Sequence, residues 1–247
     1  MALPKLTVPH YDVVCPSGQK VTFRPFLVKE EKLLMIAMQS KETETILNSA
    51  KQVLENCVEE VCGVDIDKLA LFDVEFLFLQ LRARSIGEII PLKYKCNQQV
   101  VEAETGNTVT CKAESEYPVN LLEIAPVFAP GHTKHIQLSG TVGLTLRYPT
   151  FKSFRTISRT DLRTDEAFEF VAGCIESIHD AETVFFTKDV PASEVVEFLD
   201  DMSKQQMEKL DAFFDTMPKI EKSLNFKCPK CHYEEVILVK GLDNFFA

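Results

Sequence analysis

The sequence predicts an α+β fold in which helical blocks pack with an antiparallel β block that contains a zinc-ribbon-like site of four cysteines. Apolar residues recur at helical spacing in some segments and alternate with polar residues in others, which predicts both helices and strands. The 247 residues, 45% of them hydrophobic, supply enough apolar side chains for a core. The predicted elements divide the chain into four segments: residues 1–87, 88–150, 151–217 and 218–247.

Residues 1–87 are predicted to form a β-hairpin followed by helices. Two alternating segments flank the turn-forming sequence PSGQ, as expected for a hairpin. Ser40 is expected to cap a helix that ends at Gly63, because the apolar side chains between them share one helical face. Asp73 is expected to cap a second helix that ends at Gly87. Apolar residues surround this second helix almost entirely, which predicts a place in the middle of the core.

Residues 88–150 are predicted to form a β-rich block that holds the first cysteine pair. The strand-like run EIIPLKYKC ends at Cys96, and the turn-rich run QVVEAETGNTVTC ends at Cys111. This second run is a hairpin candidate. The later sequence HIQLSGTVGLTLRYP predicts another hairpin.

Residues 151–217 are predicted to form a helical block. Thr164 is expected to cap a helix that continues through Ile178, with its apolar residues on one face. Ser203 and Gln206 have the spacing of a capping box, in which each side chain satisfies a backbone N–H of the other's residue. A further helix should begin there.

Residues 218–247 are predicted to form a zinc-knuckle hairpin and a C-terminal docking tail. The strand IEKSLNFKC leads into the turn CPKC, and the strand HYEEVILV returns from it. The tail has the sequence GLDNFFA.

Four of the eight cysteines are expected to form one structural zinc site: Cys96, Cys111, Cys228 and Cys231. Cys228 and Cys231 lie two residues apart between alternating runs, the form of one half of a zinc ribbon. Two thiolates leave two positions of a tetrahedral zinc vacant, and Cys96 and Cys111 can fill them. Only the second pair has the tight spacing, because fourteen residues separate the members of the first.

Two alternatives remain open from the sequence. CPKC can be a bare turn with free thiols, with Cys96 and Cys111 as ordinary strand residues. His232, His132 or His135 can replace a cysteine as a ligand, although a single histidine facing solvent is more often not a ligand.

Charge and cysteine usage exclude several classes of function. The formal net charge of −10 provides no large positive field for a nucleic acid or an anionic membrane. The first residues lack the apolar core of a signal peptide, and no apolar run approaches the roughly twenty residues that span a bilayer. We therefore expect the protein to occur in a reducing cytoplasm and to contain no disulfides. The remaining cysteines are then expected to be buried apolar residues: Cys15, Cys57, Cys62 and Cys174.

The sequence predicts no enzyme. It contains none of the usual motifs of zinc proteases, serine hydrolases or nucleotide-binding proteins. A zinc ion held by four thiolates has no open position for water or substrate. We therefore expect no catalytic residues and no small-molecule substrate.

Four segments together resemble the baseplate hub family of T-even-like tailed bacteriophages: RPFLVKEEKLL, MSKQQMEKLDAFFDTMP, the CPKC knuckle and the ending GLDNFFA. The resemblance extends over essentially the whole chain. It implies a structural subunit, or an assembly factor, of the contractile-tail baseplate that acts through contacts with other baseplate or tail proteins. It also implies a location in the virion tail baseplate, and in the host cytoplasm during assembly.

Phe245 and Phe246 are the expected partner-binding residues. Two aromatic side chains near a chain end are costly to leave in water, and full burial of each contributes roughly 1.5–3 kcal/mol. Packing against their own domain is the alternative. A second function also remains open, that of a cytoplasmic zinc-ribbon adaptor that binds protein partners in transcription or replication.

Overall fold

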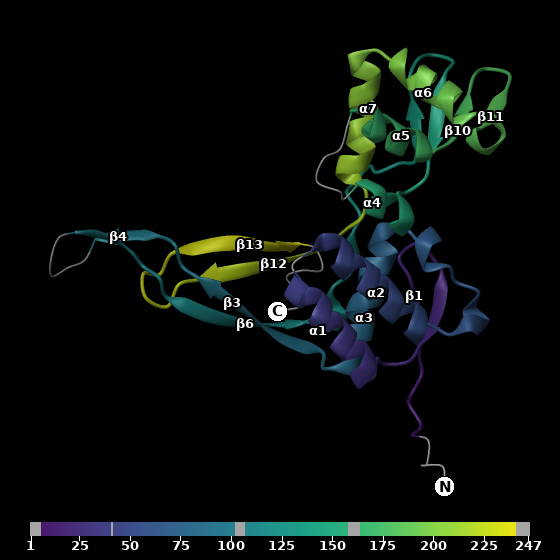
Figure 1. The fold of residues 1–247 in the computed structure, drawn as a ribbon. Helices are drawn as coiled ribbons and strands as arrows, with labels where there is room; N and C mark the ends of the chain where they lie inside the picture. Colours follow the sequence, from purple (N-terminus) through teal and green to yellow (C-terminus); the bar gives the residue numbers. More distant parts are fainter. Residues whose placement is uncertain (1–5, 41, 102–106, 158–163, 241–247) are drawn as a thin grey trace, which may run out of the picture.

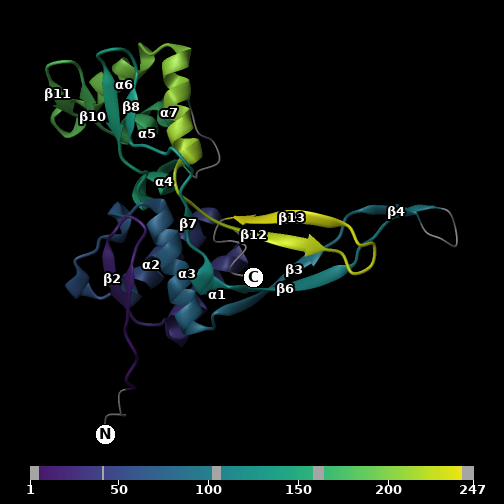
Figure 2. The same cartoon turned by 180° about the vertical axis from the view of Figure 1, so that it is seen from behind.

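The computed structural model describes residues 6–40, 42–101, 107–157 and 164–240. These residues form a helical base, a long β arm and an upper lobe of helices and strands (Figure 1). The upper lobe stands on the base, and the arm extends from the base to one side (Figure 2). Helices and antiparallel sheets occur together, so the α+β class predicted from the sequence is confirmed.

The base packs helices against the N-terminal hairpin. Strands β1 and β2 pair antiparallel, as predicted, and Phe23 of β2 lies in one core with Leu54 and Phe78. Helix α2 ends at Cys57, before the expected Gly63, because the next residue, Val58, forms a β-bridge with Phe23. The elements of the base are β1 (Tyr11–Val14), β2 (Lys20–Phe23), α1 (Val28–Ser40), α2 (Thr43–Cys57), η1 (Glu60–Cys62), η2 (Ile66–Lys68), α3 (Leu71–Ser85) and α4 (Phe151–Ile157).

Helix α1 was not predicted, and a buried ion pair fixes its start. The Glu30 carboxylate accepts a hydrogen bond from Arg24 at 3.0 Å and another from the N–H of Leu27 at 2.8 Å. Burial raises the pKa of Glu30, but these hydrogen bonds lower it below its ordinary value. Ser40, expected to cap the following helix, is instead the last residue of α1, and its hydroxyl donates to the C=O of Ala37 at 2.7 Å.

Helix α3 lies in the middle of the molecule, as its apolar sequence predicts. One face, with Leu77 and Phe78, belongs to the core of the base. The opposite face, with Leu79 and Ala83, packs against the arm in a second core. Burial on both sides explains why the apolar residues surround this helix.

Asp73 does not cap α3, contrary to the prediction. The chain before α3 is extended, because Ala70 forms a β-bridge with Thr150, and the helix begins at Leu71. Asp73 therefore lies inside the first turn, where it is buried and accepts the N–H of Ser17 at 3.1 Å. Asp73 thus holds the turn of the N-terminal hairpin against α3.

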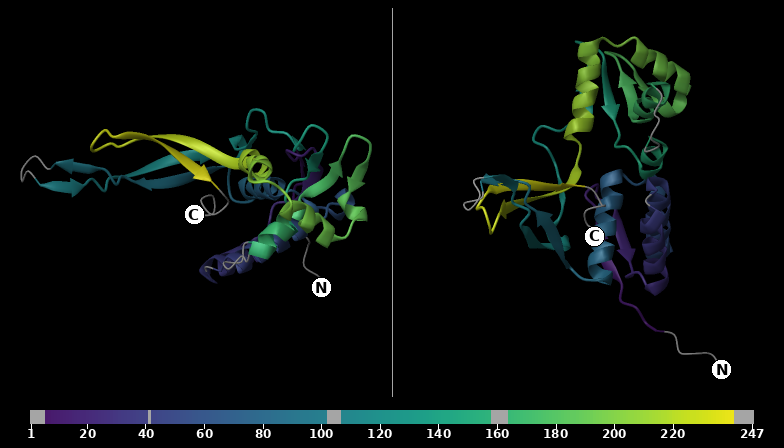
Figure 3. Two further views of the ribbon diagram at one scale, coloured as in Figure 1. Left: turned by 90° about the horizontal axis from the view of Figure 1, so that it is seen from above. Right: turned by 60° about the vertical axis from the view of Figure 1, so that its left-hand side comes forward.

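The arm consists of two antiparallel hairpins that pack against each other (Figure 3). Strands β3 and β6 form one hairpin, β12 and β13 form the other, and a small hairpin of β4 and β5 extends beyond the first. The β4–β5 and β12–β13 pairs were predicted, whereas β3 was predicted as a strand without its partner β6. The elements of the arm are β3 (Ile89–Lys95), β4 (Gln99–Val101), β5 (Thr108–Thr110), β6 (Glu114–Asn120), η3 (Leu121–Glu123), β7 (Pro126–Val127), β12 (Lys219–Lys227) and β13 (Glu234–Lys240).

The upper lobe packs helices on a four-stranded antiparallel sheet with the strand order β11-β10-β9-β8. Leu144, Ile175 and Phe213 belong to its core. The capping box at the start of α7 is confirmed, with both the Ser203 and the Gln206 hydrogen bonds present. The elements of the lobe are β8 (His135–Gln137), β9 (Gly143–Leu146), α5 (Thr164–Gly173), β10 (Ile175–His179), β11 (Val184–Phe186), η4 (Thr187–Asp189), α6 (Ala192–Asp200) and α7 (Lys204–Thr216).

The predicted helix from Thr164 through Ile178 is half wrong. Helix α5 ends at Gly173, and Ile175 and Ile178 lie in strand β10. Their spacing suits a helical face, but β10 pairs with β9 on one side and β11 on the other. Two sets of interstrand hydrogen bonds satisfy its backbone, which no local pattern could indicate.

The Asp73→Asn variant should be more stable than the original protein at pH 7.5. Burial raises the pKa of Asp73 above the ordinary aspartate value of about 4. Ionisation of this carboxyl therefore lowers the stability of the folded protein as the pH rises above about 4. The asparagine keeps the acceptor for the N–H of Ser17 and carries no charge. We expect a higher melting temperature for the variant at pH 7.5, and a difference that shrinks as the pH falls toward about 4.

Asp73→Ala is the matched control, because it also removes the charge but leaves Ser17 without its acceptor. It should be less stable than Asp73→Asn at both pH values. An asparagine variant that melts below the original protein at pH 7.5 would contradict the role assigned to burial.

Candidate metal centre

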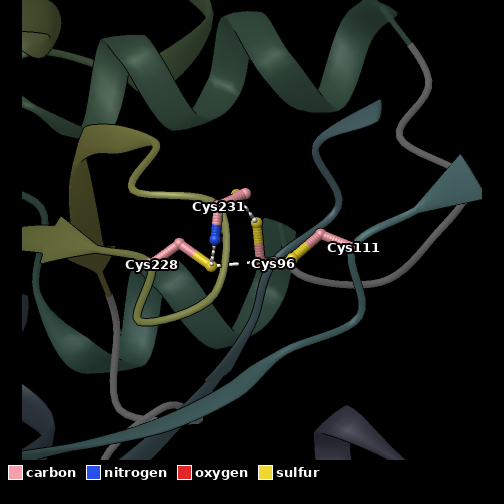
Figure 4. Close-up of side chains that lie close together, drawn as sticks. All are labelled: Cys96, Cys111, Cys228 and Cys231. Carbon is pink, nitrogen blue, oxygen red and sulfur yellow. Dashed lines mark hydrogen bonds between the residues drawn. The ribbon is translucent and has the colours of Figure 1, made fainter. Parts of the chain in front are cut away.

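Four cysteine thiols meet where the two hairpins of the arm come together (Figure 4). Cys96 follows β3, Cys111 follows β5, and Cys228 and Cys231 lie in the turn between β12 and β13. The Sγ atoms of Cys96 and Cys231 are 3.7 Å apart, and those of Cys111 and Cys228 are 3.6 Å apart. All four sulfur atoms lie within 4.8 Å of one another. The structure thus brings together the four residues that the sequence singled out.

The sulfur positions fit a tetrahedral metal ion. A zinc ion about 2.3 Å from each sulfur would place the sulfurs about 3.8 Å apart, close to the two distances observed. A disulfide requires about 2.05 Å, and all four cysteines are free thiols. Cys96, Cys111 and Cys228 are buried and Cys231 is partly exposed. Four sulfurs would complete the coordination shell, which is the arrangement of structural rather than catalytic sites.

The CPKC turn has the backbone of a metal-binding knuckle. The N–H of Cys228 donates to the C=O of Tyr233 at 2.8 Å, and the N–H of His232 donates to the C=O of Cys228 at 3.0 Å. His232 has a φ of 58°, in the left-handed region that a side chain rarely adopts. This conformation turns the chain back so that Cys228 and Cys231 share one side.

The first cysteine pair repeats the same knuckle. The N–H of Cys96 donates to the C=O of Ala113 at 2.8 Å, and the N–H of Lys112 donates to the C=O of Cys96 at 2.9 Å. Lys112, the residue after the second cysteine, has a φ of 55°. Each hydrogen bond and the positive φ therefore have a counterpart at the same relative position in the CPKC turn.

The long spacing of the first pair is explained by an inserted hairpin. The N–H of Cys111 donates to the C=O of Gln98 at 2.9 Å, and β4 and β5 pair directly beyond this bond. Gln98 and Cys111 thus lie side by side although twelve residues, 99–110, separate them. Without those residues the chain would read Cys96, Asn97, Gln98, Cys111, a CxxC motif. The sequence analysis missed this second knuckle because the inserted hairpin hides its spacing.

Hydrogen bonds from the backbone favour a negative charge on one of the four sulfurs, that of Cys228. Burial raises the pKa of Cys228. Hydrogen bonds from the N–H groups of Cys231 and Lys230 and from the neighbouring thiols have the larger, opposite effect and lower this pKa to about 6. The N–H of Cys231 lies 3.4 Å from the Cys228 sulfur. These hydrogen bonds favour the thiolate form of Cys228, which is the form that binds a metal ion.

Aromatic side chains of the two arm hairpins pack against the cysteine cluster. Phe226 packs between Tyr94 and Tyr117, with ring centroids 4.4 and 5.9 Å away. The Tyr94 hydroxyl donates to the Glu235 carboxylate at 2.5 Å, and this hydrogen bond raises the pKa of Tyr94 to about 12. The Tyr117 hydroxyl accepts the N–H of Lys227 at 3.2 Å. These contacts join the β3–β6 hairpin to the β12–β13 hairpin next to the sulfurs.

None of the three histidines considered as substitute ligands belongs to the four-sulfur cluster. His132 stacks on Tyr148 and Phe213 in the upper lobe, and its ring nitrogens contact Thr216 at 2.9 Å and Tyr148 at 3.0 Å. His135 contacts Thr145 in the same lobe. His232 is exposed beside the cluster. In the part of the chain that the structure describes, the group that could hold a metal comprises only the four cysteines.

The other cysteines behave largely as predicted. Cys15, Cys57 and Cys174 are buried in the protein. Burial raises the pKa of each thiol, so these three remain protonated at neutral pH. Cys62 is only partly buried, and its sulfur accepts the N–H of Thr22 at 3.1 Å.

Removal of residues 99–110 should leave the four-sulfur cluster intact. Residues opposite each other in such a pair have Cα atoms about 5.5 Å apart, and a peptide bond requires 3.8 Å, so a shift of about 2 Å joins Gln98 to Cys111. We expect the shortened protein to bind as much metal as the full chain, measured by elemental analysis. A loss of metal binding with retention of the fold would show that the hairpin belongs to the site.

The control is a deletion that is longer by one residue and changes the spacing of the first cysteine pair. Further removal of Gln98 places Cys96 and Cys111 one residue apart, too close for the knuckle. This second variant should lose metal.

No helix among the residues that the structure places is long and apolar enough to cross a membrane. Searches of the curated proteins and of the solved structures found no match. Over residues 8–247, however, the sequence matches the family described as T4 bacteriophage base plate protein. Because the match covers nearly the whole chain, including all four cysteines, this protein belongs to the T4 bacteriophage base plate protein family.

Proposed function

We propose that this protein is a structural subunit, or an assembly factor, of the baseplate hub of a contractile tail, and that it acts through contacts with other baseplate or tail proteins. The observation that carries the proposal is the family match over residues 8–247. The shape supports it, because an arm and a lobe that extend from one base in different directions offer separate surfaces to neighbours (Figure 1). The protein would enter the virion tail from the host cytoplasm, where assembly takes place.

A structural zinc ion is part of this proposal. Cys96, Cys111, Cys228 and Cys231 would hold it, and the sulfur distances of 3.6 and 3.7 Å support that ligand set. The ion would join two hairpins of the arm without an open position for substrate. A closed site of this kind accords with the base plate family and favours a structural role over a catalytic one. Family membership also favours the baseplate role over that of a zinc-ribbon adaptor in transcription or replication.

Quantitative mass spectrometry of purified tails and of infected-cell lysate tests the baseplate role. A structural subunit should be present in mature particles in a fixed ratio to other tail proteins. An assembly factor should occur with tail intermediates in the lysate and be absent from mature particles. A protein that accompanies neither tails nor intermediates would contradict the proposal.

Replacement of one cysteine in each knuckle should abolish zinc binding. Cys96→Ser and Cys228→Ser remove ligands at equivalent positions, and apparent binding in small zinc domains contributes on the order of 10 kcal/mol to folding. We therefore expect both variants to lose zinc in elemental analysis and to unfold at lower temperature than the original protein.

Cys62→Ser is the matched control, since it removes a partly buried thiol outside the cluster. It should retain about one equivalent of zinc, as expected for one four-thiolate site. Retention of that equivalent by either Cys96→Ser or Cys228→Ser would rule out this ligand set.

Phe245 and Phe246 are proposed to bind a neighbouring baseplate protein; both lie outside the described residues. An aromatic anchor at the centre of an interface typically costs about 2 kcal/mol or more when truncated. Deletion of the last three residues should therefore leave a folded, zinc-loaded protein that fails to enter the baseplate. Normal incorporation of the truncated protein, or loss of its fold in isolation, would contradict this assignment.

A further inference from the structure

Strand β11 presents an open, apolar sheet edge on the upper lobe. It is the outermost strand of the order β11-β10-β9-β8, and among the described residues no strand pairs with its outer side. Its three residues are all apolar and exposed: Val184 at 54%, Phe185 at 47% and Phe186 at 46%. The strand lies on the side of the molecule away from the arm (Figures 1 and 2). Soluble proteins usually blunt such an edge with charges or cover it, because it is a template for another strand.

The backbone of β11 is oriented for pairing on its outer side. A hydrogen bond of 3.0 Å from the N–H of Asp180 to the C=O of Thr183 closes the turn between β10 and β11. In an antiparallel ladder, residues bonded to the neighbouring strand alternate with residues whose polar groups point away from it. Counted from this bond, Val184 and Phe186 direct their N–H and C=O groups away from β10. An added strand would therefore find two donors, the N–H groups of Val184 and Phe186, and one acceptor, the C=O of Val184. The C=O of Phe186 accepts the first hydrogen bond of η4, because Phe186 is the N-cap of that helix.

A cavity beside β11 can take an apolar side chain from an added strand. Its volume is about 330 Å³, and Phe185 of β11 forms part of its wall together with Ile178, the residue opposite in β10. Phe198 of α6 also lines the cavity, as do Asp180, Glu194 and His179. The lining is thus mainly apolar, with two acidic groups and one histidine.

The stretch of sequence around β11 is strongly acidic, and two of its carboxyl groups, those of Asp180 and Glu194, line the cavity beside the strand. Between residues 180 and 201, seven side chains carry a carboxylate and Lys188 carries the one positive charge. Hydrogen bonds from the N–H groups of Glu182 and Thr183 lower the pKa of Asp180, which keeps it ionised. The acidic residues are Asp180, Glu182, Asp189, Glu194, Glu197, Asp200 and Asp201.

We propose that β11 binds an extended, basic segment of another baseplate protein as an added strand, with one apolar side chain of that segment in the cavity. Backbone pairing would provide affinity, and the cavity and the carboxylates would select the partner. A second copy of this chain fits poorly, because pairing of two β11 strands would bring two acidic surfaces together. The proposal rests on the baseplate function for the class of partner, whereas the binding mode rests on the edge itself.

The probe is a seven-residue peptide in which lysine alternates with valine or phenylalanine, and its binding to the full-length protein is measured by fluorescence anisotropy. Val184→Pro removes an outward N–H without loss of a bond to β10, so it should weaken binding about tenfold. Val184→Thr keeps that N–H and a β-branched side chain, and should bind like the original protein. Glu194→Lys should also weaken binding, and a peptide with glutamate in place of lysine should not bind to the original protein.

Three outcomes would overturn the proposal. They are no binding of the basic peptide, equal binding by Val184→Pro and Val184→Thr, or a dimer in sedimentation experiments that Val184→Pro converts to monomer, which would identify a second copy as the occupant. If Val184→Pro lowers the melting temperature, Glu194→Lys decides instead, because its charge reversal should weaken binding of the basic peptide with the strand intact. Peptide binding does not depend on the protein content of tails, so this test can fail while the baseplate role stands.

Discussion

The thiol cluster is the contact on which the arm depends. It joins residues 135 and 117 positions apart in the chain, Cys96 to Cys231 and Cys111 to Cys228. A two-stranded hairpin is marginally stable alone in water, so each hairpin of the arm needs the other. The cost of closing the long intervening loop grows only slowly with its length, which allows the whole upper lobe to be placed within it. A metal at the cluster would thus stabilise the end of the arm that is far from the base.

Helix α3 provides the corresponding support at the near end. Its two buried faces belong to different cores, one with the helices of the base and one with the strands of the arm. Helix α3 therefore joins the core of the base to the core at the root of the arm. Tyr148, packed edge to face on Phe72 of α3 at 4.9 Å and bonded to His132, continues these contacts toward the upper lobe. These contacts favour a rigid support for the arm and the upper lobe.

The positions of the arm and of β11 accord with the proposed role in binding neighbouring proteins. The arm and the β11 edge lie on different sides of the molecule, so two neighbours could bind without competing (Figure 1). A four-sulfur cluster offers no open coordination position, and the family consists of base plate proteins. With a net charge of −10, the protein would attract basic partners most strongly, and salt would weaken that attraction.

Local patterns in the sequence determined the elements whose signals lie within a few residues. The capping box of Ser203 and Gln206, the hairpins and the CPKC knuckle belong to this class, because a turn or a cap depends on neighbouring side chains. Tertiary structure alone decided that Gln98 and Cys111 are neighbours, since the β4–β5 hairpin sets that distance. It also placed Ile175 and Ile178 in a strand, because β9 and β11 satisfy its backbone. The identities of the four sulfur residues were thus present in the sequence, whereas their equivalence as two knuckles arose only from long-range hydrogen bonds.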